Sequence, residues 1–216
     1  MIEEHLTSKH KSILCLNGDI PVLPFLKTTK LPILATDGAG NTLMQRGIKP
    51  KLIIGDFDSV DLSSVQGITL KHEPCQSSSD FQKALKHLGE VGLLPTVILG
   101  LNGGFIDHIL NNVNIFMESD NIFYAPPILG YILKQKTSTF SFPCNTKVSL
   151  MGIPSALVSS TGLKWELKKD LLTFPGNTSC FNRTISEVFS IDVHRGSVLA
   201  LFYLQEIHDA GGREKE

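Results

Sequence analysis

Apolar and polar positions follow two different rhythms along the chain, and the change from one to the other falls near residue 126. Before that point, short β-branched or apolar runs predict strands at residues 13–16, 33–35, 52–54, 68–70, 97–99 and 122–124. Between several of these runs lie stretches with the period of a helix. We therefore expect βαβ units that build a mostly parallel α/β sheet in three layers, with helices on both faces.

Two stretches predict helices most clearly. The first covers residues 77–92 and has apolar residues at i, i+3, i+4 and i+7, namely Phe81, Ala84, Leu85 and Leu88. Ser78 or Ser79 is expected to cap its N-terminus. The second covers residues 105–117 and forms an apolar face from Ile106, Ile109, Leu110, Val113 and Met117.

The second half of the chain shows only strand patterns. Short runs at residues 137–141, 147–150, 156–159, 171–174, 189–193 and 198–202 are separated by Gly, Pro, Asn and Ser. This pattern predicts a C-terminal antiparallel β sandwich. We expect a domain boundary at Pro126-Pro127, with an α/β domain at residues 1–127 and a β-sandwich domain at residues 128–210.

Composition narrows the classes of function. The 216 residues carry a net charge of −1 without a basic block, which argues against a protein that binds nucleic acid or an anionic membrane. No apolar run reaches the length of a membrane span, and the N-terminal residues lack the apolar core of a secretory signal. The four cysteines lack metal-ligand spacing and are expected to be reduced, packed thiols of a cytoplasmic protein, in preference to a disulfide pair.

Acidic residues gather where the predicted strands end. The motif Gly55-Asp56-Phe57-Asp58-Ser59 follows one strand directly, and Asp37 follows another. The carboxyl ends of parallel strands meet at one edge of a sheet, where ligands bind. The two predicted helices begin at the same edge, so we expect this rim to carry Asp37, Asp56, Asp58, Asp80 and Asp107.

Such a cluster needs a compensating charge. Two carboxylates about 5 Å apart repel each other by roughly 3 kcal/mol at an effective dielectric constant near 20. Mg²⁺ removes that penalty, because it binds one or two carboxylates and completes its octahedron with water and phosphate oxygens. The alternative is that Asp56 and Asp58 are ordinary loop acids and that Asp80 and Asp107 only favour helix N-termini.

Other Asp-x-Asp sites fit less well. An EF-hand loop starting at Asp56 would need Gly and Glu where the chain has Asp61 and Gly67. Haloacid-dehalogenase phosphatases share the string from Asp56 to Val60, but the second half offers no equivalent of their later Lys and acidic pair. Glycosyltransferases also use this motif, and this class of enzyme stays an alternative. A Walker A loop is absent from the sequence, so any ATP is bound differently from P-loop enzymes.

Taken in order, the motifs resemble those of thiamine pyrophosphokinases. The matching segments are Asn17-Gly18, Ala35 to Ala39, Gly47 to Pro50, Ile54 to Ser59, Ser79 to Leu85, Gly103 to Leu110, Val148 to Leu150 and Thr161 to Leu167. The resemblance implies an N-terminal α/β domain, a C-terminal β sandwich and a homodimer with active sites between the subunits. It also implies transfer of the pyrophosphoryl group of ATP to thiamine, which gives thiamine diphosphate and AMP.

The same resemblance assigns roles to residues. Asp56, Asp58 and Asp80 would hold Mg²⁺ and phosphates, with one of them also acting as the base. The nucleotide would be bound by Asp37, Gly38, Lys83, Gly104, Asp107 and His108, and thiamine by Phe181 and Asn182. The alternatives are a solvated Lys83 on a polar helix face, a packed and hydrogen-bonded His108 and a buried Phe181. Trp165 is interpreted as sandwich core in preference to a residue that stacks on the ligand.

Three departures from the family pattern keep alternatives open. Phe105 stands where Arg is frequent, Ser77 where Asp is frequent, and Phe181 where Ser usually precedes Asn. These changes leave open a non-catalytic thiamine or nucleotide binder. A metal-dependent phosphatase with Asp56 as nucleophile is the other alternative.

Overall fold

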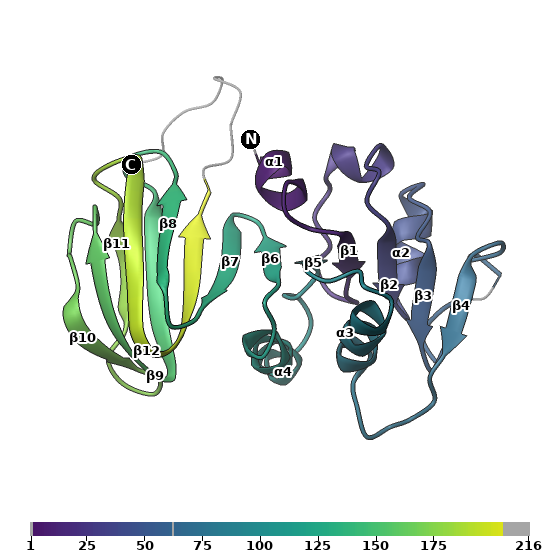
Figure 1. Ribbon diagram of the computed structural model, residues 1–216. Coiled ribbons are helices and arrows are strands. Elements are labelled where there is room, and N and C mark those ends of the chain that lie inside the picture. Colours follow the sequence, from purple (N-terminus) through teal and green to yellow (C-terminus); the bar gives the residue numbers. More distant parts are fainter. Residues whose placement is uncertain (1, 62, 205–216) are drawn as a thin grey trace. The chain divides into compact units, whose positions relative to one another are not determined.

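Six parallel strands form the sheet of the N-terminal part of the chain (Figure 1). The structure is a computed structural model that describes residues 2–61 and 63–204. The strands are β1 (Ser12–Cys15), β2 (Ile33–Thr36), β3 (Leu52–Gly55), β4 (Thr69–His72), β5 (Thr96–Leu99) and β6 (Ile122–Ala125). They lie in the order β6-β5-β1-β2-β3-β4, and each neighbouring pair is parallel. The predicted parallel sheet is confirmed.

The strand order explains why the predicted strands are continuous apolar runs. Every residue of β1, β2, β3, β5 and β6 is buried, because the sheet is covered on both faces. The chain runs from β1 out to β4 and then returns to β5 on the other side of β1. This reversal creates a switch point at the carboxyl ends of β1 and β5, which is where open α/β sheets bind ligands.

The helices are α1 (Ile2–Thr7), α2 (Ala39–Gln45), α3 (Asp80–Glu90) and α4 (Ile106–Met117), with a short 3₁₀ helix η1 (Pro24–Lys27). Right-handed crossovers put α2 on one face of the sheet and α3 and α4 on the other, since the chain crosses the sheet in opposite directions before and after β4. Figure 1 shows α3 and α2 on opposite sides of the strands. The three predicted layers are therefore present.

The two predicted helices differ in how they are buried. Helix α3 buries Phe81, Ala84 and Leu88 as expected, and Ser79 caps it in a reciprocal capping box with Gln82. Helix α4 buries Ile115 and Phe116 instead of the start of its predicted face. Ile106 is 70% exposed and Leu110 is 57% exposed. None of the five residues of the predicted face is buried, so that prediction was wrong, and the first turns of α4 are exposed within the part of the chain that the structure describes.

The C-terminal part contains β7 (Ile128–Leu133), β8 (Thr137–Ser141), β9 (Lys147–Thr161), β10 (Lys168–Thr173), β11 (Ser179–Arg183) and β12 (Val188–Tyr203). Four short predicted strands are in fact two long ones. The runs at 147–150 and 156–159 belong to β9, and those at 189–193 and 198–202 belong to β12. The pairing of β12 with β9 shifts between Val193 and Arg195 and between Gly196 and Val198, so the interruptions are β-bulges and not strand ends.

The long β9–β12 pair contributes to two layers of antiparallel strands. The first part of β9 pairs with β11 and with the end of β12, whereas its last part pairs with β10 and with the start of β12. The start of β12 also pairs with β8. Between the layers, Phe140, Phe142, Phe189 and Phe202 pack with ring centroids 4.7 to 6.3 Å apart. The predicted antiparallel β sandwich is confirmed.

Contacts divide the chain into two compact units. One comprises the described residues up to Ala125 together with Gly130–Ile132, and the other comprises Pro126–Leu129 and the described residues from Leu133 onward. The boundary at residue 127 stays a prediction, and residues 205–210 of the expected second domain lie outside the described residues. Within the described part of the chain, no helix is long and apolar enough to cross a membrane.

The cysteines are unpaired, but three of them are not packed. Cys15 is buried in β1, whereas Cys75, Cys144 and Cys180 are exposed. The expectation of four packed thiols was wrong, because the sequence around these three residues is in loops and on the strand β11, where one side faces solvent.

Replacing Phe202 by Ala tests the phenylalanine core. Phe202 is fully buried and contacts three other rings, so we expect the free energy of unfolding to fall by about 3–5 kcal/mol. Urea unfolding followed by circular dichroism measures this change. The exposed Phe174 supplies a matched control, and Phe174→Ala should cost well under half as much. Equal losses in the two variants would contradict this account of the core.

Candidate active site

Three carboxylates meet at the carboxyl ends of two neighbouring strands. Asp37 follows β2 and Asp56 follows β3, and these strands pair in register at Thr36 and Ile54. The Asp37 amide donates to the Ile54 carbonyl at 3.1 Å, which fixes the two loops side by side. One carboxylate oxygen from each of Asp37, Asp56 and Asp58 lies within 4.8 Å of the others. The expected convergence of acids is therefore present for these three residues.

A cavity of about 260 Å³ surrounds this acidic cluster. Six further residues from the sequence motifs also line it: Asn17, Gly38, Asp80, Lys83, Gly103 and His108. Asn17 follows β1 at the switch point of the sheet. Seven of the predicted site residues, namely Asp37, Gly38, Asp56, Asp58, Asp80, Lys83 and His108, thus line one cavity in the N-terminal unit.

Two predicted nucleotide-binding residues lie outside the lining of this cavity. Gly104 is exposed and has a φ of +76°, while its neighbour Gly103 lines the cavity. Asp107 is also exposed, and its Oδ1 accepts a hydrogen bond from the His108 amide at 2.8 Å. This places Asp107 in the first turn of α4, where a carboxylate stabilises the helix N-terminus.

Asp37 is the buried member of the acidic cluster. Its side chain is only 3% exposed, and its Oδ2 accepts a hydrogen bond from the Ser59 amide at 3.0 Å. Its Oδ1 is buried and has no hydrogen-bond partner among the described residues. Burial, helped by the nearby carboxylates of Asp58 and Asp80, raises the pKa of Asp37 above its ordinary value. A buried acceptor without a donor is costly unless a cation or a proton reaches it.

Asp56 is half-buried and Asp58 is exposed in the loop that follows β3. Phe57 between them has a φ of +65°, which is rare for a residue with a side chain, and its ring stacks on His72 with centroids 5.4 Å apart. Such backbone strain concentrates at functional sites. Asp56 accepts a hydrogen bond from Gln76 at 2.7 Å, and this contact is the main reason that the pKa of Asp56 is lowered.

Asp80 and Lys83 form an ion pair at the start of α3. The Lys83 Nζ atom lies 2.9 Å from the Asp80 Oδ1 atom, and Lys83 is buried. A Cβ on Gly55 would lie 3.1 Å from the Asp80 Oδ2 atom and 2.9 Å from the Asp37 Cβ atom, so glycine at this position lets α3 approach the rim. The structure therefore groups Asp37 with Asp56 and Asp58, while the predicted third metal ligand, Asp80, is engaged with Lys83.

Two contributions to the site escaped the sequence reasoning. Gln76 contacts Asp56 from the loop between β4 and α3, and Ser59 donates its amide to Asp37. Periodicity carries no information on the path of a loop, so nothing in the pattern pointed to Gln76. The Ser59 contact follows from the tight turn after Asp58, which only the backbone geometry reveals.

In the C-terminal unit, the predicted thiamine residues differ in exposure. Phe181 is 58% exposed with a φ of +56°, and the Lys147 Nζ atom lies 5.9 Å from its ring centroid. Asn182 is buried, and its amide group makes hydrogen bonds with both the backbone N–H and the backbone carbonyl of Trp165. It also bonds the Arg183 amide and the Ser179 hydroxyl, which leaves it no free capacity.

Trp165 is not part of the sandwich core. Its side chain is 56% exposed, and the Lys164 Nζ atom lies 4.8 Å from the ring centroid. The interpretation of Trp165 as sandwich core was wrong. Trp165 lies on the loop between β9 and β10, and Asn182 holds this loop by hydrogen bonds to the Trp165 backbone, which leaves the indole ring exposed. An exposed tryptophan with a fixed backbone offers a flat apolar surface.

Comparisons with known proteins agree with the motifs. Residues 25–124 match the family model described as "Thiamin pyrophosphokinase, catalytic domain". Thiamine pyrophosphokinase 3 of Oryza sativa subsp. japonica is 27% identical over 161 residues, which cover 64% of this chain and 60% of that protein. The chain thus spans about 60% of the length of the curated relatives that it matches.

Solved structures extend the similarity to the whole fold. The thiamine pyrophosphokinase from Bacillus subtilis has a TM-score of 0.78 at 17% identity, covering 91% of this chain and 100% of that chain. The yeast enzyme has a TM-score of 0.79 at 19% identity, covering 93% of this chain and 89% of that chain. The resemblance to this family that the motifs indicated is confirmed.

Replacing Asp37 by Asn tests its electrostatic state in the metal-free protein. Because the pKa of Asp37 is raised on folding, the folded chain binds more protons than the unfolded chain just above the ordinary pKa of 3.8. Stability that is present below this window is therefore lost as the pH rises through it. Asn carries no charge, so we expect Asp37→Asn to gain stability over the wild type at pH 7 and less so at pH 4.

Urea unfolding at both pH values, with a chelator present, measures this difference. Asp61→Asn is the matched control, because Asp61 is exposed and hydrogen-bonded to Ser63, and its pKa is lowered. Asp61→Asn should show no gain in the free energy of unfolding at pH 7. A pH dependence of stability that is identical in the wild type and in Asp37→Asn would refute the assignment.

Proposed function

We propose that this chain is a Mg²⁺-dependent thiamine pyrophosphokinase, which transfers the pyrophosphoryl group of ATP to thiamine and releases AMP. One observation carries the proposal: three carboxylates lie within 4.8 Å of one another at the carboxyl edge of a parallel sheet. The match of residues 25–124 to the family's catalytic domain supports the same activity.

The acidic cluster fits a magnesium ion. Its donors are all carboxylate oxygens, which hard divalent cations prefer, and the buried Asp37 Oδ1 atom has no other partner among the described residues. We infer that Asp37, Asp56 and Asp58 hold the ion, with Asp80 close enough to contact its water or a phosphate. Bound there, Mg²⁺ would neutralise charge that develops on the transferred group.

The residues around the acidic cluster are assigned to the nucleotide. Lys83 is buried beside Asp80, and its charge would bind a phosphate oxygen. Gly38 and His108 line the same cavity and would shape the nucleotide pocket, with Gly104 and Asp107 at its margin. We assign Asp37 to the metal, whereas the sequence analysis assigned it to the nucleotide.

The reaction needs an in-line displacement at the β-phosphorus. The hydroxyethyl oxygen of thiamine forms a bond to this phosphorus, while the bond from the phosphorus to the oxygen bridging the α- and β-phosphates breaks and AMP leaves with the electron pair. The hydroxyl proton passes to a carboxylate, for which Asp56, Asp58 and Asp80 are the candidates. Gln76 holds Asp56 in place by its hydrogen bond.

Thiamine is assigned to the C-terminal unit. The exposed rings of Trp165 and Phe181 supply flat apolar surfaces on which a heterocycle can stack. Asn182 would act by holding the Trp165 backbone and not by contacting thiamine itself, because its hydrogen-bonding groups are already used.

A cytoplasmic homodimer is the assembly that we propose, with active sites at the subunit interface. The exposed start of α4 supports it, since Phe105, Ile106 and Leu110 are 84%, 70% and 57% exposed within the described residues. Phe105 replaces an Arg that is frequent in the family, and an apolar residue here suits a protein interface better than a phosphate site.

The activity is tested by incubating the protein with ATP, Mg²⁺ and thiamine and separating the products. We expect AMP and thiamine diphosphate in equal amounts. Asp56→Asn and Asp58→Asn should each raise the barrier by several kcal/mol, which lowers turnover by about three orders of magnitude. Asp61→Asn changes an exposed acid outside the cluster and should leave turnover unaltered.

Other products would decide against the transferase. Inorganic phosphate without a diphosphate ester would indicate a phosphatase. Binding of ATP and thiamine in calorimetry without turnover at high enzyme concentration would indicate a non-catalytic binder.

The dimer is tested by placing a charge on the exposed face of α4. Ile106→Asp and Leu110→Asp each put a charge where apolar contact is expected, so we expect the mass in sedimentation analysis to fall to that of one 23.7 kDa chain. Val22→Asp alters an equally exposed apolar residue on another segment and should leave the dimer intact. A wild-type protein that sediments as a monomer at every concentration would exclude this assembly.

A further inference from the structure

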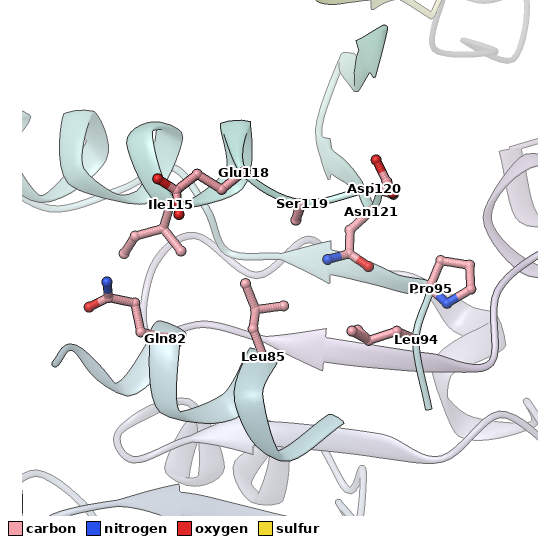
Figure 2. Close-up of a pocket in the computed structure, with 9 residues that line it drawn as sticks. All are labelled: Gln82, Leu85, Leu94, Pro95, Ile115, Glu118, Ser119, Asp120 and Asn121. Atoms are coloured by element: carbon pink, nitrogen blue, oxygen red, sulfur yellow. The ribbon is translucent and has the colours of Figure 1, made fainter. Parts of the chain in front are cut away.

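The acidic cluster is the one place within the described part of the chain where three metal-binding side chains come together. A larger cavity of about 610 Å³ lies between α3 and α4, and its lining also includes two carboxylates, those of Glu118 and Asp120. Figure 2 shows these two carboxylates directed away from each other. A preference for one divalent cation over another is therefore expected to arise at the acidic cluster.

Each carboxylate of the acidic cluster is hydrogen-bonded through one of its two oxygens. The Asp37 Oδ2 atom accepts from the Ser59 amide at 3.0 Å, and the Asp58 Oδ1 atom accepts from the Ser59 hydroxyl at 2.7 Å. The Asp56 Oδ2 atom accepts from the side-chain amide of Gln76 at 2.7 Å. Two residues, Ser59 and Gln76, thus supply a donor to every carboxylate of the cluster.

The second oxygen of each carboxylate lacks a close donor among the described residues. The Asp37 Oδ1 atom is buried without a hydrogen-bond partner, and the Asp58 Oδ2 atom accepts no hydrogen bond from residues 2–61 and 63–204. The Asp56 Oδ1 atom has only a long contact, 3.5 Å from the Asp58 amide nitrogen. The acidic cluster therefore presents one bare oxygen from each of its three carboxylates.

A hydrogen bond influences which oxygen of a carboxylate binds a cation. The donor withdraws negative charge from the oxygen that it contacts and fixes the rotation of the carboxylate, so the other oxygen is the stronger ligand. Mg²⁺ suits such single oxygens, because its octahedron takes few carboxylates and keeps positions for water and phosphate oxygens. Ca²⁺ takes about 6–8 oxygens and binds well to carboxylates that use both of theirs.

We propose that Ser59 and Gln76 determine metal specificity, because they make each carboxylate of the acidic cluster a ligand through one oxygen and so favour Mg²⁺ over Ca²⁺. Both are positioning residues, since each acts through a carboxylate. The inference rests on the proposed function for the presence of a divalent cation at the cluster, and it goes beyond that function in naming what selects the cation.

Competition for bound Mn²⁺ tests the proposal on the full chain without nucleotide. Mn²⁺ also occupies octahedral oxygen sites, and the electron paramagnetic resonance signal of the free ion reports how much of it is displaced. The measured quantity is the ratio of the Ca²⁺ concentration to the Mg²⁺ concentration that displaces half of the bound Mn²⁺. We expect this ratio to be greater than one in the wild type.

Gln76→Met and Ser59→Ala each remove a side-chain donor and leave both oxygens of one carboxylate available. Each variant should lower the ratio by about tenfold, which is the lower end of the effect of residues that orient metal ligands. A loss of orientation alone would weaken the binding of both ions and leave the ratio unchanged. Both residues are exposed, so both variants are expected to fold.

Ser63→Ala and Gln45→Met are the matched controls. Ser63 donates its hydroxyl to Asp61 at 2.6 Å outside the acidic cluster, and Gln45 is an exposed glutamine of α2. Both control variants should keep the wild-type ratio.

The outcomes separate this inference from the proposed function. A wild type that binds Ca²⁺ at least as tightly as Mg²⁺ would overturn the inference, and so would an unchanged ratio in Gln76→Met and Ser59→Ala. Absence of Mn²⁺ binding to the wild type would overturn it together with the metal site of the proposed function.

Discussion

Repulsion among carboxylates at the end of two adjacent strands is the constraint on which the N-terminal unit depends. The chain could have spread these charges over its surface, yet it brings Asp37, Asp56 and Asp58 within 4.8 Å and buries the first of them. Burial of a carboxylate without a full set of donors lowers stability unless an ion compensates. The neighbouring features serve this arrangement: glycine at position 55, the strained turn at Phe57 and the hydrogen bonds from Ser59 and Gln76.

Much of the N-terminal fold could be predicted from the sequence, because its strands and longer helices follow simple apolar periodicity. The six parallel strands and the helices α3 and α4 were found within a few residues, since buried strands are continuous apolar runs. The convergence of Asp37 with Asp56 and Asp58 followed from topology alone, because carboxyl ends of parallel strands share an edge. Helix α2 was missed, since its seven residues are too short to show a period.

The remaining differences come from contacts between distant segments. The ion pair of Asp80 with Lys83 forms because Lys83 is buried, which the sequence pattern does not reveal. The contact of Gln76 with Asp56 depends on the path of the loop between β4 and α3. In the second unit, glycine and proline looked like strand ends but mark bulges within β9 and β12. Trp165 looked like core because tryptophan is usually buried, whereas here its backbone is anchored by Asn182 and its ring is exposed.

The bends within β9 and β12 have a consequence for how the second unit comes apart. The same two strands supply hydrogen bonds to both layers, so opening one layer removes order from strands that continue into the other. We therefore expect the amide protons of both layers to exchange through one common opening event, as in a single cooperative unit. The exposed rings of Trp165 and Phe181 then keep their positions until this cooperative unit unfolds.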